Sequence, residues 1–160
     1  MIQVKDVVKS FDGNVVLNHV SANFEDGKVN MIIGQSGSGK TVLMKSMIGL
    51  HQIDGGEIVF DTRAGQQNLA GMTEKEVRML HREVGMLFQG AALFDSMTVQ
   101  ENVMYPLEMF SDMTDEEKVE RARFCLERVN MPERAFGLMP SEISGGMQKR
   151  VAIARAIALN

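Results

Sequence analysis

The sequence is poor in the features that mark several other classes of protein. Cysteine occurs only once, at Cys125, so an internal disulfide and a metal site built from several cysteines are both excluded. No stretch approaches the roughly 20 consecutive apolar residues that cross a bilayer. Internal repeats, low-complexity tracts and linker-like segments are also missing. We therefore expect one globular domain that reaches any membrane only through a partner protein, which suits its 160 residues and 44% apolar content.

Positive charge is not in excess either. The 17 basic and 21 acidic residues give a net charge of -4, whereas broad binding to nucleic acid rests on many contacts between basic side chains and phosphates. We therefore expect no nucleic-acid partner. The N-terminus shows no basic segment followed by an apolar stretch, so no secretory signal is expected, and the single cysteine fits a reducing compartment. These features favour the cytoplasm.

Runs of β-branched residues predict that the chain begins with antiparallel sheet. Two valine-rich runs are separated by residues 11–14, which include Asp12 and Gly13 and suit a hairpin turn. The strands that we expect are 2–8, 15–24, 29–33, 57–60 and 84–88. The polar stretch that follows the fourth of them, as far as Gly71, has no clear periodicity and is expected to be a loop.

Threonine caps mark the starts of three expected helices. In this pattern the threonine caps the helix and a glutamate three residues later reaches back to it. The pairs with this spacing are Thr73 with Glu76, Thr98 with Glu101, and Thr114 with Glu117. Two more helices are expected, one at 41–50 and one from near Gly146 to the end of the chain at Asn160.

Residues 34–41 have the sequence GQSGSGKT, which fits the phosphate-loop pattern GxxxxGKT between an expected strand and an expected helix. A triphosphate carries several negative charges, so its binding needs free backbone amides, the positive end of a helix dipole and a cation. The glycines, the helix and Lys40 supply these, and the hydroxyl of Thr41 suits Mg²⁺. We expect a nucleoside triphosphate and Mg²⁺ to be held by Gly34, Gln35, Ser36, Gly37, Ser38, Gly39, Lys40 and Thr41. By itself, the loop indicates only a nucleoside triphosphatase or a kinase. The alternative is a glycine-rich turn with an incidental lysine.

A second place suited to an anion precedes the last expected helix. Ser144 is a suitable helix cap, and Gly145 and Gly146 would let a ligand approach the backbone amides without obstruction by side chains. The same residues are equally compatible with a capped helix after a flexible turn. The residue pattern by itself leaves both interpretations open.

The segment ISGGMQKRVAIARAIA resembles the signature segment of ABC-transporter ATPases. That resemblance extends over the whole chain and implies an α/β P-loop NTPase fold with an N-terminal antiparallel part and a helical subdomain. It makes residues 34–41 the Walker A loop, Phe11 the aromatic that stacks on adenine, and Gln89 the Q-loop glutamine, a catalytic and magnesium-contacting position. Lys40 is the other catalytic residue that it implies. The signature loop would contribute Ser144, Gly145, Gly146 and Gln148 to nucleotide binding.

Partners also follow from the resemblance. In such proteins two subunits enclose two ATP molecules head to tail, so a homodimer is implied, with Ser144 facing the terminal phosphate held by the other subunit's Lys40. The stretch 91–109 resembles the face that receives a permease membrane subunit, which implies a peripheral location on the inner face of the cell membrane. The implied division is a nucleotide-binding core at about 1–90, a helical subdomain at about 91–145 and the signature helix at 146–160. Within the family, the segments MLFQGAALFDSMTVQENVMYPL and SGGMQKRVAIARAIAL are together most similar to Mla-type lipid-transport ATPases.

The residues that activate water in this family cannot be assigned in the sequence. Asp61 follows a short apolar run, but it precedes the signature segment and is therefore rejected as the Walker B acid. The three histidines also precede Ser144, whereas the switch histidine of the family follows the signature. We therefore expect a truncated ABC ATPase that keeps its phosphate-binding parts and lacks its water-activating parts.

Two other functions remain as alternatives. A soluble ABC-type ATPase of translation or DNA maintenance shares the same motifs, although members that act in DNA maintenance carry a long coiled coil for which the segment between the two motifs has no room. A P-loop kinase or GTPase shares only the phosphate loop, and the ISGGM segment counts against it.

Overall fold

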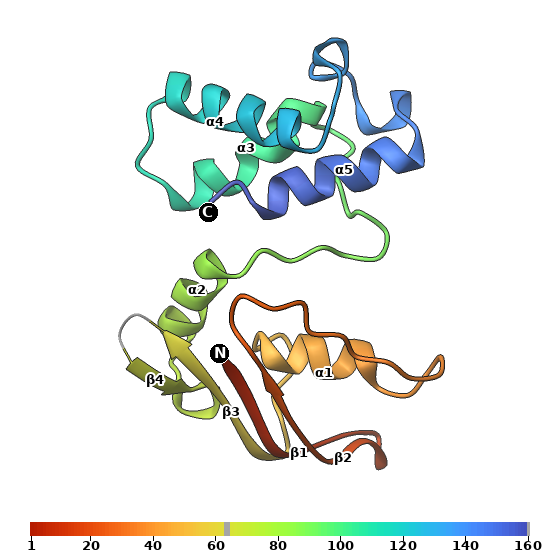
Figure 1. Ribbon diagram of the computed structural model, residues 1–160, viewed down its shortest axis with the longest axis vertical. Coiled ribbons are helices and arrows are strands. Elements are labelled where there is room, and N and C mark those ends of the chain that lie inside the picture. The colour runs from red at the N-terminus through yellow and green to blue at the C-terminus, as the bar shows by residue number, and fades with distance from the viewer. Residues whose placement is uncertain (63–64, 160) are drawn as a thin grey trace. The chain divides into compact units, whose positions relative to one another are not determined.

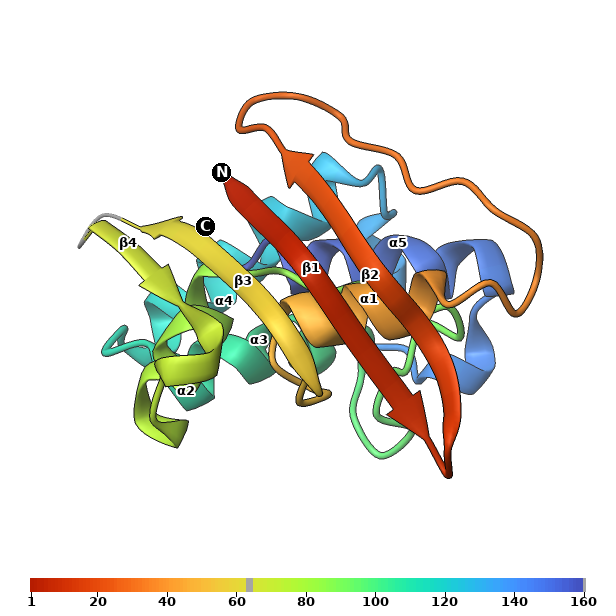
Figure 2. The ribbon, with the colours of Figure 1, turned by 90° about the horizontal axis from the view of Figure 1, so that it is seen from below.

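The computed structural model describes residues 1–62 and 65–159, in two compact units, Met1–His81 and Arg82–Asn160. In the first unit, strands β1 (Ile2–Phe11), β2 (Asn14–Phe24), β3 (Gly55–Thr62) and β4 (Gly65–Asn68) form an antiparallel sheet in the order β2-β1-β3-β4. Figures 1 and 2 show helix α1 (Lys40–Met47) lying across one face of this sheet. The predicted opening hairpin is confirmed.

Apolar residues on one face of the sheet explain where α1 packs. Val4, Val7 and Ile58 are almost completely buried, as are Leu43 and Met47 on the helix. Burial of such side chains contributes about 25 cal/mol for each Å² removed from water, so the sheet and α1 stabilise each other. The short helix η1 (Leu69–Gly71) and helix α2 (Glu74–Glu83) follow β4.

The second unit is a bundle of three helices that pack on one another: α3 (Val99–Phe110), α4 (Asp115–Arg128) and α5 (Gly145–Ala156). Two short helices, η2 (Glu133–Ala135) and η3 (Pro140–Glu142), connect α4 to α5. Val103, Leu107, Leu126 and Val151 are fully buried at its centre. In the described ranges, none of the helices has the length and apolarity that a membrane span requires.

The three predicted threonine caps are confirmed. The Thr98 hydroxyl accepts from the amide of Glu101, whose carboxylate accepts from the amide of Thr98 at 2.7 Å, and Thr114 and Glu117 repeat the arrangement at α4. Thr73 and Glu76 make the corresponding bonds at α2. These bonds hold the pKa of the Glu101 carboxyl below its ordinary value, because the backbone amide and hydroxyl of Thr98 stabilise its charged form.

Three predictions about strands and loops are wrong. Residues 65–68 of the expected loop form β4, because their backbones pair with residues 59–62 of β3, while 63–64 lie outside the described residues. Residues 29–33 and 84–88 are not strands in the part of the chain that is described. An apolar run forms a strand only where a neighbouring backbone offers hydrogen bonds, and Val29, Met31 and Ile33 are instead 94%, 75% and 84% exposed.

Two helix ends also differ from the prediction. Helix α1 ends at Met47 rather than at residue 50, and Gly49 beyond it has a φ of 76°, a conformation common just after helices. Helix α5 ends at Ala156 and is followed by turns as far as Leu159. The predicted last residue of that helix, Asn160, lies outside the described residues.

Candidate nucleotide-binding site

The phosphate loop leads into a helix N-terminus that carries no capping side chain. Gly39 is the N-cap of α1 and has a φ of 86°, so glycine is favoured there over any residue with a Cβ. The first amides of a helix have no partner within it, and glycine offers them no side-chain oxygen. The first turn of α1 reads Lys-Thr-Val-Leu and adds no acidic group. The amides and the positive end of the helix dipole are therefore available to an anion.

Lys40 lies over the loop that precedes its helix. Its Nζ donates to the carbonyl oxygens of Gly34, at 2.8 Å, and Gln35, at 2.5 Å. Residues 34–38 of the loop are exposed, and Thr41 exposes its side chain in the first turn of α1. An ammonium group, several backbone amides and a hydroxyl therefore lie along one short stretch of chain, most of which is exposed. A hydroxyl oxygen is a hard ligand of the kind that Mg²⁺ prefers, so Thr41 fits the predicted metal role.

Phe11 lies at the end of β1, in the same unit as the phosphate loop. Phe11 is 40% exposed, and its ring has the Lys9 ammonium 5.2 Å from its centroid and makes an edge-on contact with the His51 ring at a centroid distance of 5.4 Å. Lys9 also donates to Asp54 at 2.7 Å, while the Ser10 amide donates to the same carboxylate at 2.6 Å. These bonds lower the pKa of Asp54 and fix the end of β1 next to Phe11.

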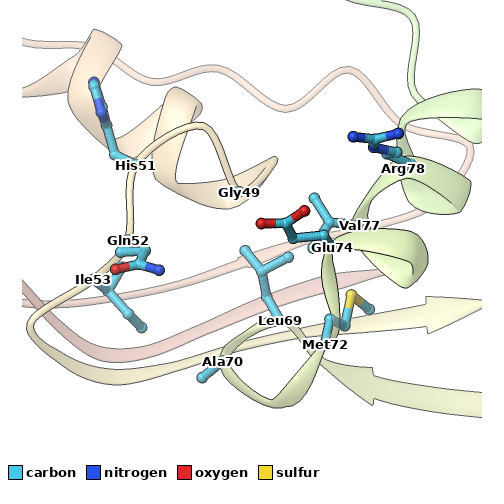
Figure 3. Close-up of a pocket in the computed structure, with 10 residues that line it drawn as sticks. All are labelled: Gly49, His51, Gln52, Ile53, Leu69, Ala70, Met72, Glu74, Val77 and Arg78. Carbon is cyan, nitrogen blue, oxygen red and sulfur yellow. The ribbon is translucent and has the colours of Figure 1, made fainter.

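The sequence pattern did not reveal that His51 is a neighbour of Phe11. It also lines a half-enclosed pocket of about 460 Å³ between the loop after α1, η1 and α2. In Figure 3 the side chains of Leu69, Glu74 and Val77 are directed toward the loop at Gly49. The residues that line this pocket are Gly49, His51, Gln52, Ile53, Leu69, Ala70, Met72, Glu74, Val77 and Arg78, so it is distinct from the phosphate loop.

The second predicted anion site is at the start of α5. Ser144 is its N-cap, and the Ser144 hydroxyl accepts from the Met147 amide at 3.3 Å. Ser144, Gly145 and Gly146 are exposed, and no acidic residue occurs in the first turn. Gln148 is partly buried, and its Nε2 donates to the Pro140 carbonyl oxygen at 2.8 Å. The Gln148 amide therefore ties the first turn of α5 to η3.

Gln89 lies in the second unit as well, on an exposed turn in which the Ala91 amide donates to the Phe88 carbonyl at 3.0 Å. The first unit thus holds Phe11 and residues 34–41, and the second holds Gln89 and residues 144–148. Each unit has a helix N-terminus preceded by small residues, with Gly39 buried at α1 and Ser144 exposed at α5.

Known proteins resemble this chain in both sequence and fold. The ABC transporter family matches residues 17–160. The methionine import ATP-binding protein MetN of Rhizobium johnstonii is 35% identical over 158 residues, covering 99% of this chain and 42% of that protein. The glutamine transport ATP-binding protein GlnQ of Escherichia coli is 38% identical over 159 residues, covering 99% and 64%. The chain thus spans about half the length of the curated relatives it matches.

A solved structure also resembles this chain in both sequence and fold. The dimeric, post-hydrolysis structure of the ATP-binding cassette MJ0796 with ADP and Pi superposes with a TM-score of 0.90 at 32% identity, covering 100% of this chain and 70% of that one. Its fold is therefore that of an ABC ATPase cassette, as the resemblance implied. The same family is indicated by the phosphate loop, the signature segment, the family match and the fold. The chain belongs to the ABC transporter family, as an ATP-binding domain.

Proposed function

We propose that this chain is the ATP-binding part of an ABC transporter subunit that couples ATP binding and hydrolysis to movement of a cargo by a membrane partner. The observation that carries the proposal is the N-terminus of α1, where a glycine N-cap leaves the first amides free and Lys40 lies across the preceding loop. This arrangement suits the polyphosphate of a nucleotide, because amides, helix dipole and ammonium all favour negative charge.

The residues have separate roles in this proposal. The ring of Phe11 stacks on the base, residues 34–39 bind phosphate oxygens through their amides, and Lys40 neutralises the outer phosphates. Thr41 contacts Mg²⁺ through its hydroxyl, and Gln89 contacts the metal and the reacting phosphate. Mg²⁺ itself neutralises charge on the phosphates during hydrolysis. Breaking the hydrogen bonds from Lys40 to Gly34 and Gln35 releases the ammonium for the nucleotide.

The signature end of α5 is proposed to act in a homodimer. Ser144, Gly145 and Gly146 are exposed and offer amides to an anion, and in a head-to-tail pair that anion is the terminal phosphate on the other subunit's Lys40. The dimeric MJ0796 cassette supports this assembly, as its name states a dimer with ADP and Pi. We further propose that a permease subunit binds segment 91–109, which places the protein on the inner face of a membrane.

The cargo is proposed at two levels of detail. Import of a small solute has the support of relatives named for methionine, glutamine and phosphonates. The finer hypothesis, a lipid carried by an Mla-type system, rests only on the resemblance of residues 86–107 and 144–159. The named relatives are transport proteins, so they do not favour a soluble ATPase of translation or DNA maintenance. Copurification with a membrane subunit, followed by mass spectrometry of bound solutes and lipids, decides between the cargoes.

Calorimetric titration of the purified chain with MgATP tests the proposal. The unsubstituted chain should bind with saturation at millimolar or lower concentrations, and Lys40→Ala should weaken binding at least tenfold. The matched control is Lys45→Ala, since Lys45 is the basic residue in the last turn of the same helix. A chain that melts cooperatively but shows no binding, or equal losses for the two variants, would contradict the proposal.

A further inference from the structure

The last turn of α5 is bonded to the segment that follows Gln89. Arg155 donates from Nη1 to the Ala92 carbonyl oxygen at 2.8 Å and from Nη2 to the Ala91 carbonyl oxygen at 2.9 Å. Its guanidinium carbon also lies 5.8 Å from the centroid of the Phe94 ring. Because guanidinium is planar, its two terminal nitrogens can bond two neighbouring carbonyls at once. One side chain therefore contacts three residues of this segment.

The backbone that Arg155 holds is in an uncommon conformation. Ala91 and Ala92 have φ values of 62° and 48°, in the left-handed region that L-residues with a Cβ disfavour. Such conformations persist where the surroundings enforce them, and they are frequent at functional sites. Burial lowers the pKa of the Arg155 guanidinium, although arginine stays charged in proteins, so its two bonds to carbonyl oxygens are charge-assisted.

Two other contacts fix the same segment on either side of Gln89. Gly85 lies so close to α5 that an added Cβ would be 2.1 Å from the Ala156 carbonyl oxygen. Asn102, fully buried on α3, accepts from the Phe94 amide at 2.8 Å and donates to the carbonyl oxygens of Phe94 and Met97, each at 3.1 Å. Gln89 itself is exposed between these anchors. The Gln89 turn is thus fastened to the helices of the second unit.

We propose that Arg155 is a positioning residue that links the Gln89 turn to the signature helix. Helix α5 has Ser144 at its N-cap and Arg155 in its last turn, and its 12 residues form one rod of about 18 Å. A movement of α5 when its N-terminus meets a phosphate therefore moves the Gln89 turn through the guanidinium. The inference rests on the proposed function, in which both ends act on the nucleotide.

A spin label on the turn reports the link without requiring nucleotide. Gly90 is exposed, and a Cβ added there meets nothing within 4 Å, so Gly90→Cys accepts a nitroxide label. The native Cys125 is buried and should not react in the folded chain. The variants are Arg155→Ala and Arg155→Lys in this labelled background. Arg150→Ala is the matched control, because Arg150 is on the same helix and donates to the Asn130 carbonyl oxygen at 3.2 Å.

We expect the label to tumble at least threefold faster in Arg155→Ala, and to an intermediate degree in Arg155→Lys, because one ammonium cannot span both carbonyls. Arg150→Ala should leave the spectrum unchanged. Arg155→Lys keeps the charge and the apolar stem, so it decides the question if Arg155→Ala fails to fold. An unchanged spectrum in a folded Arg155 variant would overturn the proposal, as would equal loosening in Arg150→Ala.

Kinetics of the intact transporter subunit separate positioning from loss of structure. Arg155→Lys should lower kcat for ATP at least tenfold, with KM within threefold and the dissociation constant for MgATP within twofold of the unsubstituted values. A rise in that dissociation constant as large as the fall in kcat would contradict a positioning role. If the unsubstituted chain binds no MgATP, the proposed function fails, while the spectrum of the label still decides whether Arg155 holds the turn.

Discussion

At the scale of single residues, the site combines groups that favour negative charge with an exposed aromatic ring. Lys40 provides a full charge, the amides from Gly37 to Thr41 provide partial charges, and Phe11 provides an apolar surface that is 40% exposed. Charge alone would bind any polyphosphate. In the proposed function, discrimination in favour of a nucleoside is therefore assigned to the ring of Phe11.

Substitution of Phe11 tests this division of roles. Phe11→Ala should weaken MgATP binding by about 1–3 kcal/mol, the usual value of stacking between a base and an aromatic side chain. It should leave the binding of inorganic tripolyphosphate unchanged, since that ligand has no base. Phe11→Tyr is the matched control and should bind both ligands normally. Equal weakening for the two ligands, measured by calorimetry, would contradict the stacking role.

Gly39 is where backbone conformation and close packing coincide. Its φ is 86°, and an added Cβ would lie 3.0 Å from the Val16 carbonyl oxygen and 3.1 Å from Leu17. Gly13, in the β1–β2 turn, has a similar φ of 82° but has nothing within 4 Å of such a Cβ.

We expect Gly39→Ala to lower the free energy of unfolding by more than Gly13→Ala, which should cost only about 1–2 kcal/mol for the left-handed conformation. The extra loss comes from contact of the new methyl group with β2. Urea unfolding followed by circular dichroism measures both values. Equal losses would mean that the packing of the loop against β2 contributes nothing.

At the scale of elements, the clearest local signals are the threonine caps. Thr98 and Glu101 satisfy two helix-terminal amides by reciprocal bonds of 3.2 Å and 2.7 Å. Thr98→Ala removes the oxygen that accepts from Glu101 and should lower the free energy of unfolding by about 1 kcal/mol. Thr98→Ser keeps the hydroxyl and should cost much less. Urea midpoints that do not differ between the two variants would contradict the role of the cap.

The same reasoning explains which elements could be predicted from the sequence. The cap of α3 depends on residues three positions apart, and the β1–β2 hairpin depends on a short turn with Asp12 and Gly13, so both can be recognised locally. Strand β4 is a polar edge strand that is defined only by its pairing with β3. Residues 29–33 have the composition of a strand, yet in the described chain they belong to no sheet.

The same distinction between local and long-range signals explains which parts of the candidate site could be predicted. The phosphate loop was predictable because its chemistry is contained in eight consecutive residues, whose glycines and lysine have the expected places. The contact of His51 with Phe11 and that of Arg155 with Ala91 were not, since they join distant segments, 64 positions apart in the second case. Pattern alone gives no sign of either contact.

At the scale of the whole molecule, the chain carries two helix N-termini preceded by small residues, one in each compact unit. One has a lysine and the other has a serine with two glycines, so they suit different positions around one polyphosphate. The fold agrees with that of a cassette described as a dimer. ATP-dependent pairing of chains is the corresponding expectation for this protein.

Sedimentation measures that pairing. In MgATP the apparent mass should rise from 17.7 kDa toward twice that value, because in the proposed head-to-tail pair each nucleotide would contact both chains. Ser144→Glu should prevent the rise, since a carboxylate at the helix N-terminus repels phosphate. Ser96→Glu, at an exposed turn in the same unit, adds the same charge and should not prevent it. Pairing that is equally strong without nucleotide would contradict the head-to-tail arrangement.

The central claim is that main-chain amides at the head of α1 hold the phosphates, and amide NMR of the isotopically labelled chain observes those groups directly. On addition of MgATP, the amide resonances of residues 37–41 should shift together with saturation, and in Lys40→Ala the same shifts should require at least tenfold more nucleotide. Resonances at 37–41 that stay in place up to millimolar MgATP, in a chain with a dispersed spectrum, would contradict the account.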